Sequence, residues 1–102
     1  MVNIRLFCNA GMSTSLLVSK MRQAAEAEGI EADIVAYGAT EVTHRIDEAD
    51  VALLGPQIAY RKAELGKIAA DHGVPLEVIP AMDYGMVNGK KVLELALKLA
   101  GK

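Results

Sequence analysis

Alternating stretches of apolar and polar residues predict four β-strands along the chain. The first is expected over residues 3–8, and the second over residues 30–37, where apolar and polar positions alternate as in a partly buried strand. Residues 51–54 are all apolar, which is typical of a central parallel strand covered on both faces. Residues 75–79 predict a fourth strand, and the proline and glutamate within it favour an edge position.

Helical spacing of apolar residues predicts the remaining elements. A first helix is expected over residues 13–28, a short one within residues 40–49, and a third over residues 57–72. Residues 80–88 are expected to form a loop. A closing helix then carries apolar positions from residue 92 to residue 99.

This order of elements predicts the fold class. Strand and helix alternate four times, so we expect an α/β fold with one four-stranded parallel sheet, strand order 2-1-3-4, and helices on both faces. In such sheets a ligand binds beyond the carboxyl ends of the strands, where the strand order reverses. That point lies between the first and third strands. It should bring Cys8 beside Gly55, Pro56 and Gln57, within reach of the segment 82–85.

Composition narrows the function classes. The chain has 102 residues, 52% of them hydrophobic and 24% charged, and is expected to form a single domain over residues 1–102. A net charge of −2 without a long basic run argues against nucleic-acid binding. A single cysteine excludes an internal disulfide and fits a reducing cytoplasm, and no apolar run approaches the roughly 20 residues of a membrane span. No cluster of Cys and His has metal-ligand spacing, so we expect neither metal nor cofactor.

The junction of the first strand and first helix carries the candidate chemistry. Cys8 ends the strand, and the residues expected to form a phosphoryl-binding loop follow it: Asn9, Ala10, Gly11, Met12, Ser13, Thr14 and Ser15. Backbone N–H groups at such a turn and the positive end of the helix dipole form an anion site, and the same field favours a nucleophilic thiolate. A lone cysteine is often only a small buried hydrophobic residue. The glycine and the three hydroxyls suit an anion and do little for an apolar core, so we favour a covalent phosphoryl acceptor.

The same segment also invites comparison with low-molecular-weight tyrosine phosphatases, whose signature is Cys-x5-Arg-Ser/Thr. Ser15 matches the final hydroxyl, but Thr14 stands where the arginine belongs. No bidentate donor is then available for the phosphoryl oxygens. Asp83 is the only tempting general acid, and a solvated turn carboxylate is its preferred interpretation. The sequence thus favours holding a phosphoryl group on sulfur without hydrolysing it.

We hypothesise that an arginine at position 14 would hold the group too firmly or assist hydrolysis. Phosphatase activity and phosphocysteine lifetime in Thr14→Arg would test this.

Several further residues are candidates for the periphery of the site. Three roles are considered for Gln57: a hydrogen-bond donor to a phosphoryl group, a contact with a partner, or a cap of the third helix. Met12 and Tyr60 are interpreted as an apolar rim for a docking partner or as core. His44 and His72 are assigned structural roles, the latter near a helix end.

Two long blocks carry a resemblance to a known family. Residues 8–21, CNAGMSTSLLVSKM, resemble the active-site segment of enzyme IIB components of the bacterial phosphoenolpyruvate-dependent sugar phosphotransferase system, lactose/cellobiose type. Residues 51–60, VALLGPQIAY, resemble a second characteristic block, and Tyr84-Gly85 with the closing helix match the C-terminal end. The similarity covers essentially the whole chain. It also implies the fold of the low-molecular-weight tyrosine phosphatases.

The resemblance implies a phosphoryl relay. Cys8 would accept a phosphoryl group from a phosphohistidine on enzyme IIA, carry it as phosphocysteine, and pass it to a cellobiose-, lactose- or chitobiose-like sugar bound in the membrane protein enzyme IIC. The chain would be a monomer that forms transient complexes in the cytoplasm and at the inner face of the membrane. Gln57, Tyr60 and Tyr84 would lie at the periphery of the site.

Two alternatives come from other classes of protein. One is a cysteine-dependent hydrolase, related to phosphatases or arsenate reductases, against which the missing arginine and the absence of a second cysteine both count. The other is a redox-sensing module that acts through Cys8. It predicts sulfenylation and no phosphoryl acceptance.

Overall fold

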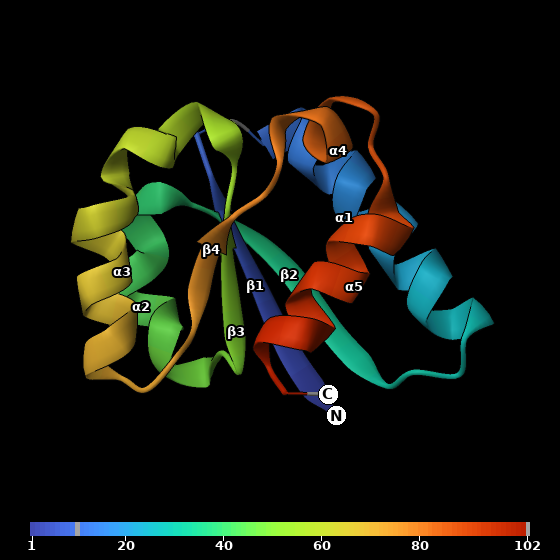
Figure 1. The fold of residues 1–102 in the computed structure, drawn as a ribbon, viewed down its shortest axis with the longest axis horizontal. Coiled ribbons are helices and arrows are strands. Elements are labelled where there is room, and N and C mark those ends of the chain that lie inside the picture. Colours follow the sequence, from blue (N-terminus) through green and yellow to red (C-terminus); the bar gives the residue numbers. More distant parts are fainter. Residues whose placement is uncertain (10, 102) are drawn as a thin grey trace.

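A four-stranded parallel sheet forms the centre of the protein (Figure 1). The computed structural model describes residues 1–9 and 11–101, with side chains over the same ranges except residues 11–13. The strands are β1 (Val2–Cys8), β2 (Ala32–Gly38), β3 (Val51–Leu54) and β4 (Leu76–Val78), in the order β2-β1-β3-β4. The predicted fold class and strand order are confirmed, and β4 is an edge strand as expected.

Helices cover both faces of this sheet. Helices α1 (Gly11–Ala27) and α5 (Gly89–Leu99) lie on one face, and α2 (Val42–Arg45) and α3 (Lys62–Asp71) lie on the other (Figure 1). Successive side chains of β1 point to opposite faces. Leu6 and Cys8 therefore pack with α1 and α5, whereas Phe7 packs with α2 and α3.

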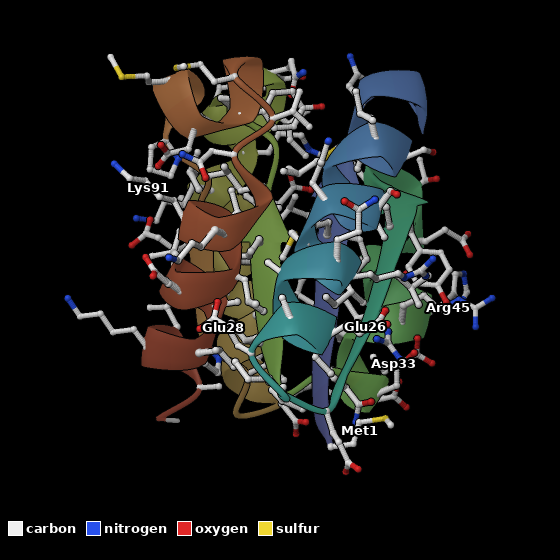
Figure 2. The ribbon with its side chains drawn as sticks, turned by 90° about the vertical axis from the view of Figure 1, so that its right-hand side faces the viewer. Met1, Glu26, Glu28, Asp33, Arg45 and Lys91 are labelled. Atoms are coloured by element: carbon white, nitrogen blue, oxygen red, sulfur yellow. The ribbon has the colours of Figure 1, made fainter. Side chains whose placement is uncertain are left out.

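Helices α1 and α5 run side by side, as Figure 2 shows, and a glycine lets them approach closely. A Cβ atom built on Gly89 would lie 2.5 Å from the backbone carbonyl carbon of Lys20 and 2.6 Å from the backbone nitrogen of Met21. No side chain fits in this gap. The absence of a side chain at Gly89 therefore sets the spacing of the two helices.

The predicted strands agree with the structure within two residues, and the predicted helices differ from it at three places. Helix α1 begins at Gly11, earlier than residue 13, so the junction after Cys8 is shorter than expected. The helix predicted over residues 57–72 is divided into a 3-10 helix η3 (Pro56–Arg61) and α3. Inside η3 the chain is also kinked at Ile58, whose φ of −116° and ψ of 25° are not helical.

The third difference is a short helix, α4 (Ala81–Gly85), where a loop was predicted over residues 80–88. This single turn buries only Tyr84, so its sequence carries no periodic pattern that would reveal a helix. The short helix predicted within residues 40–49 is present as α2, flanked by the 3-10 helices η1 (Ala39–Glu41) and η2 (Ile46–Glu48).

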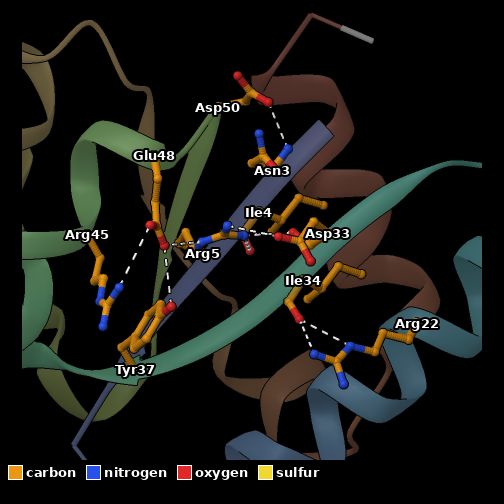
Figure 3. Close-up of polar contacts among 10 residues, drawn as sticks. All are labelled: Asn3, Ile4, Arg5, Arg22, Asp33, Ile34, Tyr37, Arg45, Glu48 and Asp50. Carbon is orange, nitrogen blue, oxygen red and sulfur yellow. Dashed lines mark hydrogen bonds and ion pairs between the residues drawn. The ribbon is translucent and has the colours of Figure 1, made fainter. Parts of the chain in front are cut away.

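A buried arginine on the central strand ties three elements together (Figure 3). The Arg5 guanidinium bonds to Glu48 of η2 at 2.8 Å and to Asp33 of β2 at 2.9 Å. Burial lowers the pKa of Arg5, but the hydrogen bonds to these carboxylates outweigh it and raise the pKa above its ordinary value. The hydrogen bond from Arg5 likewise holds the pKa of Glu48 below its ordinary value. Glu48 also accepts a hydrogen bond from the Tyr37 hydroxyl at 3.3 Å, so the network fixes the end of β2.

Candidate active site

Cys8 is the last residue of β1 and lies at the carboxyl edge of the sheet. Its side chain is 3% exposed and belongs to the core cluster beneath α1 and α5. In the parallel register Cys8 lies beside Gly38 of β2. Helix α1 begins only three positions later, so its N-terminus adjoins the thiol.

The first turn of α1 gives this junction its electrostatic character. The first N–H groups of a helix have no partner within the helix, and the dipole adds a positive partial charge at the same end. An anion attached to Cys8 would face these donors. The predicted combination of cysteine and helix N-terminus is therefore present, although the hydroxyl-bearing residues 13–15 lie inside the helix and not in a loop before it.

A cavity of about 130 Å³ opens at Cys8. The described residues that line it are Cys8, Asn9, Thr14, Ser15, Ala36, Tyr37 and Gly38. The first four were predicted from the sequence, whereas the three from β2 were missed. The predicted strand order could have identified these three residues, because the end of β2 must lie beside the end of β1 when the two strands pair in parallel.

The opposite side of Cys8 faces β3, as predicted. A Cβ atom on Gly55 would lie 2.8 Å from the Cys8 Sγ and 2.6 Å from the Gln57 Oε1. Gln57 therefore lies next to the thiol, as the predicted strand order requires, and its role at the periphery of a site stays a prediction. Among the described residues, no side-chain hydrogen bond caps the start of η3.

Thr14 and Tyr84 join the cavity to the C-terminal part of the chain. Their hydroxyl oxygens lie 2.9 Å apart, and both side chains are buried. Thr14 occupies the position of the phosphatase arginine, and its hydroxyl is held by a phenol from α4. Tyr84 thus approaches the site from below the surface and does not form part of an open rim.

Other predicted site residues are less directly placed. Ala10 and the side chains of Gly11, Met12 and Ser13 lie outside the described residues. Tyr60 in η3 is 81% exposed and does not line the cavity among the described residues, so its interpretation as core is wrong.

The remaining polar candidates have no demonstrated link to the cavity. Asp83 lies in the first turn of α4, and His44 lies exposed on α2. The Nδ1 of His72 donates to the carbonyl of Ile68 at 3.0 Å at the end of α3, as a structural role predicts.

Residues 1–9 and 11–101 contain neither a metal-binding cluster nor a membrane-spanning helix. No group of three or more His, Cys, Asp and Glu side chains in those ranges is arranged to hold a metal ion. No helix in the same part of the chain has the length and apolar character needed to span a bilayer.

Comparison with known proteins gives the family. Residues 3–95 match the profile of the family described as "PTS system, Lactose/Cellobiose specific IIB subunit". The chain belongs to this IIB family. It is 46% identical over 99 residues to the oligo-beta-mannoside-specific EIIB component of Bacillus subtilis, covering 97% of this chain and 96% of the relative. It is also 46% identical over 101 residues to the cellobiose-specific EIIB component of Lactococcus lactis subsp. lactis, covering 94% of each.

Solved IIB structures share the fold. The cellobiose-specific phosphotransferase IIB component from Borrelia burgdorferi superimposes with a TM-score of 0.82 at 42% identity, covering 98% of this chain and 92% of that one. The lactose-specific IIB domain from Streptococcus pneumoniae superimposes with a TM-score of 0.86 over 96% of both chains, and at 15% identity it shows the fold alone. IIB components act as sugar phosphotransferases, so membership of the IIB family confirms the predicted class of activity.

Proposed function

We propose that Cys8 is the phosphoryl carrier of this IIB protein. The observation that carries the proposal is the position of its thiol, at the end of a central strand, on the wall of a cavity and beside the N-terminus of α1. The cavity walls provide hydroxyl and backbone groups, which suit a phosphoryl group bound to sulfur.

The chemistry consists of two transfers. In the first, the Cys8 thiolate attacks phosphorus of a phosphohistidine on enzyme IIA. An S–P bond forms, the P–N bond breaks, and the histidine nitrogen leaves with the electron pair. In the second, a sugar hydroxyl in enzyme IIC attacks the same phosphorus and gives its proton to a base in enzyme IIC or to water. The S–P bond breaks, and the sulfur leaves with the electron pair as the thiolate.

The α1 N-terminus and the cavity hydroxyls stabilise the negative charge that develops on the phosphoryl oxygens in both steps. Thr14 offers a neutral hydroxyl where a phosphatase has a guanidinium. A neutral donor binds a phosphoryl group more weakly than a charged bidentate one, which favours onward transfer.

The partners are proposed to be enzyme IIA and the membrane-embedded enzyme IIC, met in the cytoplasm and at the inner face of the membrane. Exposed apolar side chains lie on elements at the end of the sheet where Cys8 lies: Leu16 on α1, Tyr60 on η3, Met82 on α4, and Met86 directly after α4. Figure 1 shows α4 beside the start of α1, so this surface adjoins the candidate site. Such side chains suit a transient, partly apolar interface.

The sugar is proposed to be of the cellobiose, lactose or chitobiose type. Relatives with 46% identity are named for oligo-beta-mannosides, galactose and cellobiose, which supports a mono- or oligosaccharide of this range. Choice among these sugars is assigned to enzyme IIC.

The test is the intact mass of the protein after incubation with phosphorylated enzyme IIA. One phosphoryl adduct is expected on the wild type and none on Cys8→Ser. The adduct should disappear when membranes containing enzyme IIC and the sugar are added. No adduct on a folded wild type with its cognate enzyme IIA would refute the carrier role. Turnover of an aryl phosphate would then favour the hydrolase, and stable sulfenylation without phosphorylation the redox module.

A further inference from the structure

The Thr14 hydroxyl contributes to the cavity that contains Cys8, yet a residue seventy positions away holds it. Thr14 is 1% exposed, lines the cavity, and has its Oγ1 at 2.9 Å from the Tyr84 hydroxyl. A threonine in a helix divides between two side-chain rotamers because its hydroxyl can bond to the preceding turn of backbone. A hydrogen bond from another element selects one of them. The hydrogen bond to Tyr84 therefore favours one position of the Thr14 oxygen in the cavity that contains Cys8.

Tyr84 is itself fixed by its surroundings. Its side chain is 8% exposed and packs in the same core cluster as Cys8 and Leu17. Its backbone N–H donates to the Pro80 carbonyl at 3.0 Å, and its carbonyl accepts from the Val87 N–H at 3.1 Å.

The chain after α4 is held against its local preference. Val87 has a φ of +52°, a left-handed conformation that is unfavourable for a β-branched residue. Such strain persists only where tertiary contacts dictate it. Here, Gly89 lies two residues on and packs against the α1 backbone at Lys20. The position of Tyr84 against α1 is thus set by the tertiary structure.

We propose that Tyr84 is a positioning residue for phosphoryl transfer. Its phenol holds the Thr14 hydroxyl in the rotamer that contacts an oxygen of the phosphoryl group on Cys8. This inference rests on the proposed function of Cys8. In the phosphatases an arginine binds the phosphoryl oxygens. Here the Thr14 hydroxyl would take that role, and the Tyr84 hydroxyl would hold it in position.

The experiment compares four variants with the wild type. Tyr84→Phe removes only the phenol oxygen, Thr14→Val removes the hydroxyl while keeping the shape, Thr14→Ser keeps the hydroxyl, and the double variant combines the first two. Thr43→Val, on an exposed position of α2 on the other face of the sheet, is the matched control. The rate of adduct formation at saturating phosphorylated enzyme IIA is measured for each, together with its thermal midpoint.

We expect Tyr84→Phe and Thr14→Val to slow the transfer by about tenfold each. A hydrogen-bond donor that is absent or misplaced stabilises the transition state less than a preorganised donor does. The double variant should be no slower than Thr14→Val alone, because the two groups act as one unit. Thr14→Ser should recover most of the rate, and Thr43→Val should match the wild type. A merely structural role for Tyr84 would lower the thermal midpoint and leave the rate unchanged.

Two results would overturn the inference: a wild-type rate in Tyr84→Phe, whatever the rate of Thr14→Val, or effects that multiply in the double variant. A titration with inorganic phosphate, followed by amide chemical shifts, provides an independent readout without enzyme IIA. Both single variants should weaken phosphate binding to the same extent, and unequal weakening contradicts the inference. If the wild type binds phosphate but forms no adduct, the carrier role fails while the phosphate titration still decides the role of Tyr84. A wild type that neither binds phosphate nor forms the adduct would refute both the carrier role of Cys8 and the positioning role of Tyr84.

Discussion

Gly55 and Cys8 are packed so closely that a methyl group at Gly55 would overlap the thiol. The added Cβ would lie 2.8 Å from the Cys8 Sγ and 3.3 Å from the Cys8 Cβ. The Gly55 backbone, with φ −62° and ψ 145°, is accessible to any residue. The requirement for glycine here is therefore a matter of space beside the thiol and not of backbone conformation.

Gly55→Ala should displace the Cys8 thiol from its rotamer. The clash with Gln57 is relieved by motion of a long flexible side chain, but the cysteine has only one torsion with which to respond. We expect phosphorylation by enzyme IIA to slow by tenfold or more, because a misplacement of about 1 Å costs on the order of 10²-fold in rate. The measurement is the rate of adduct formation, with Gly66→Ala in α3 as the control, since its Cβ would meet only Leu76 Cδ2 at 4.0 Å. Equal rates for the two variants would contradict this account.

Gly89→Ala should destabilise the protein, because the new methyl group would meet backbone atoms of α1 at 2.5–2.6 Å. Backbone atoms cannot rotate away, so α5 must shift, at an expected cost of about 1–3 kcal/mol in the free energy of unfolding. Gly66→Ala should instead stabilise by about 0.5–1 kcal/mol, since alanine is the better helix former and there is room for its methyl group. Urea denaturation measures both. A Gly89→Ala variant as stable as the wild type would show that the α1–α5 contact is looser than described.

Glu48→Gln should reduce the dependence of stability on acid pH. The hydrogen bond from Arg5 lowers the pKa of Glu48 below its ordinary value of 4.5. This ionised carboxylate therefore stabilises the fold above pH 4.5, and the contribution is lost as the pH falls through the lower folded-state pKa. Wild type should exceed Glu48→Gln in stability at pH 7, and the difference should shrink as the pH falls below that ordinary value.

The control for Glu48→Gln is Glu64→Gln. The pKa of Glu64 is also lowered, by its hydrogen bond from Arg61, but this pair lies on the exposed surface of η3 and α3. Exposed ion pairs contribute little to stability. Urea denaturation at pH 7 and pH 3 should therefore show a smaller change for Glu64→Gln, and an equal or larger one would contradict the importance of the Arg5 network.

Polar substitutions at the exposed methionines should weaken docking of enzyme IIA without affecting chemistry. Met82 and Met86 are 75% and 74% exposed, so Met82→Gln and Met86→Gln leave the core intact. We expect the concentration of enzyme IIA for half-maximal phosphorylation rate to rise several-fold while the maximal rate stays constant. Ala27→Gln is the control, because Ala27 is exposed and ends α1, at the opposite end of this helix from its N-terminus beside Cys8. A change in the maximal rate alone would assign these residues to the transfer step.

The sequence by itself determined the fold class and the strand order, and it predicted Cys8 as the nucleophile. Residues 51–54 are all apolar, which requires burial on both faces and makes them a central strand. The alternation of strands and helices then places the carboxyl end of this strand beside that of residues 3–8. Cys8 followed by glycine and hydroxyls predicted the anion site because strand end and helix start are adjacent along the chain. These features depend on neighbouring residues or on the order of the elements, so the pattern of apolar residues along the sequence is enough to predict them.

Only the tertiary structure decided what surrounds the thiol. The contacts Thr14–Tyr84, Cys8–Gly55 and Lys20–Gly89 join residues between 47 and 70 positions apart. Side-chain shape at such distances leaves no periodic trace in the sequence. Helix α4 is too short to show a helical repeat, and Val87 adopts a conformation that its own preference opposes. The packing of α4 and α5 against α1 therefore determines how the cavity is built, whereas the sequence had already determined where it would be.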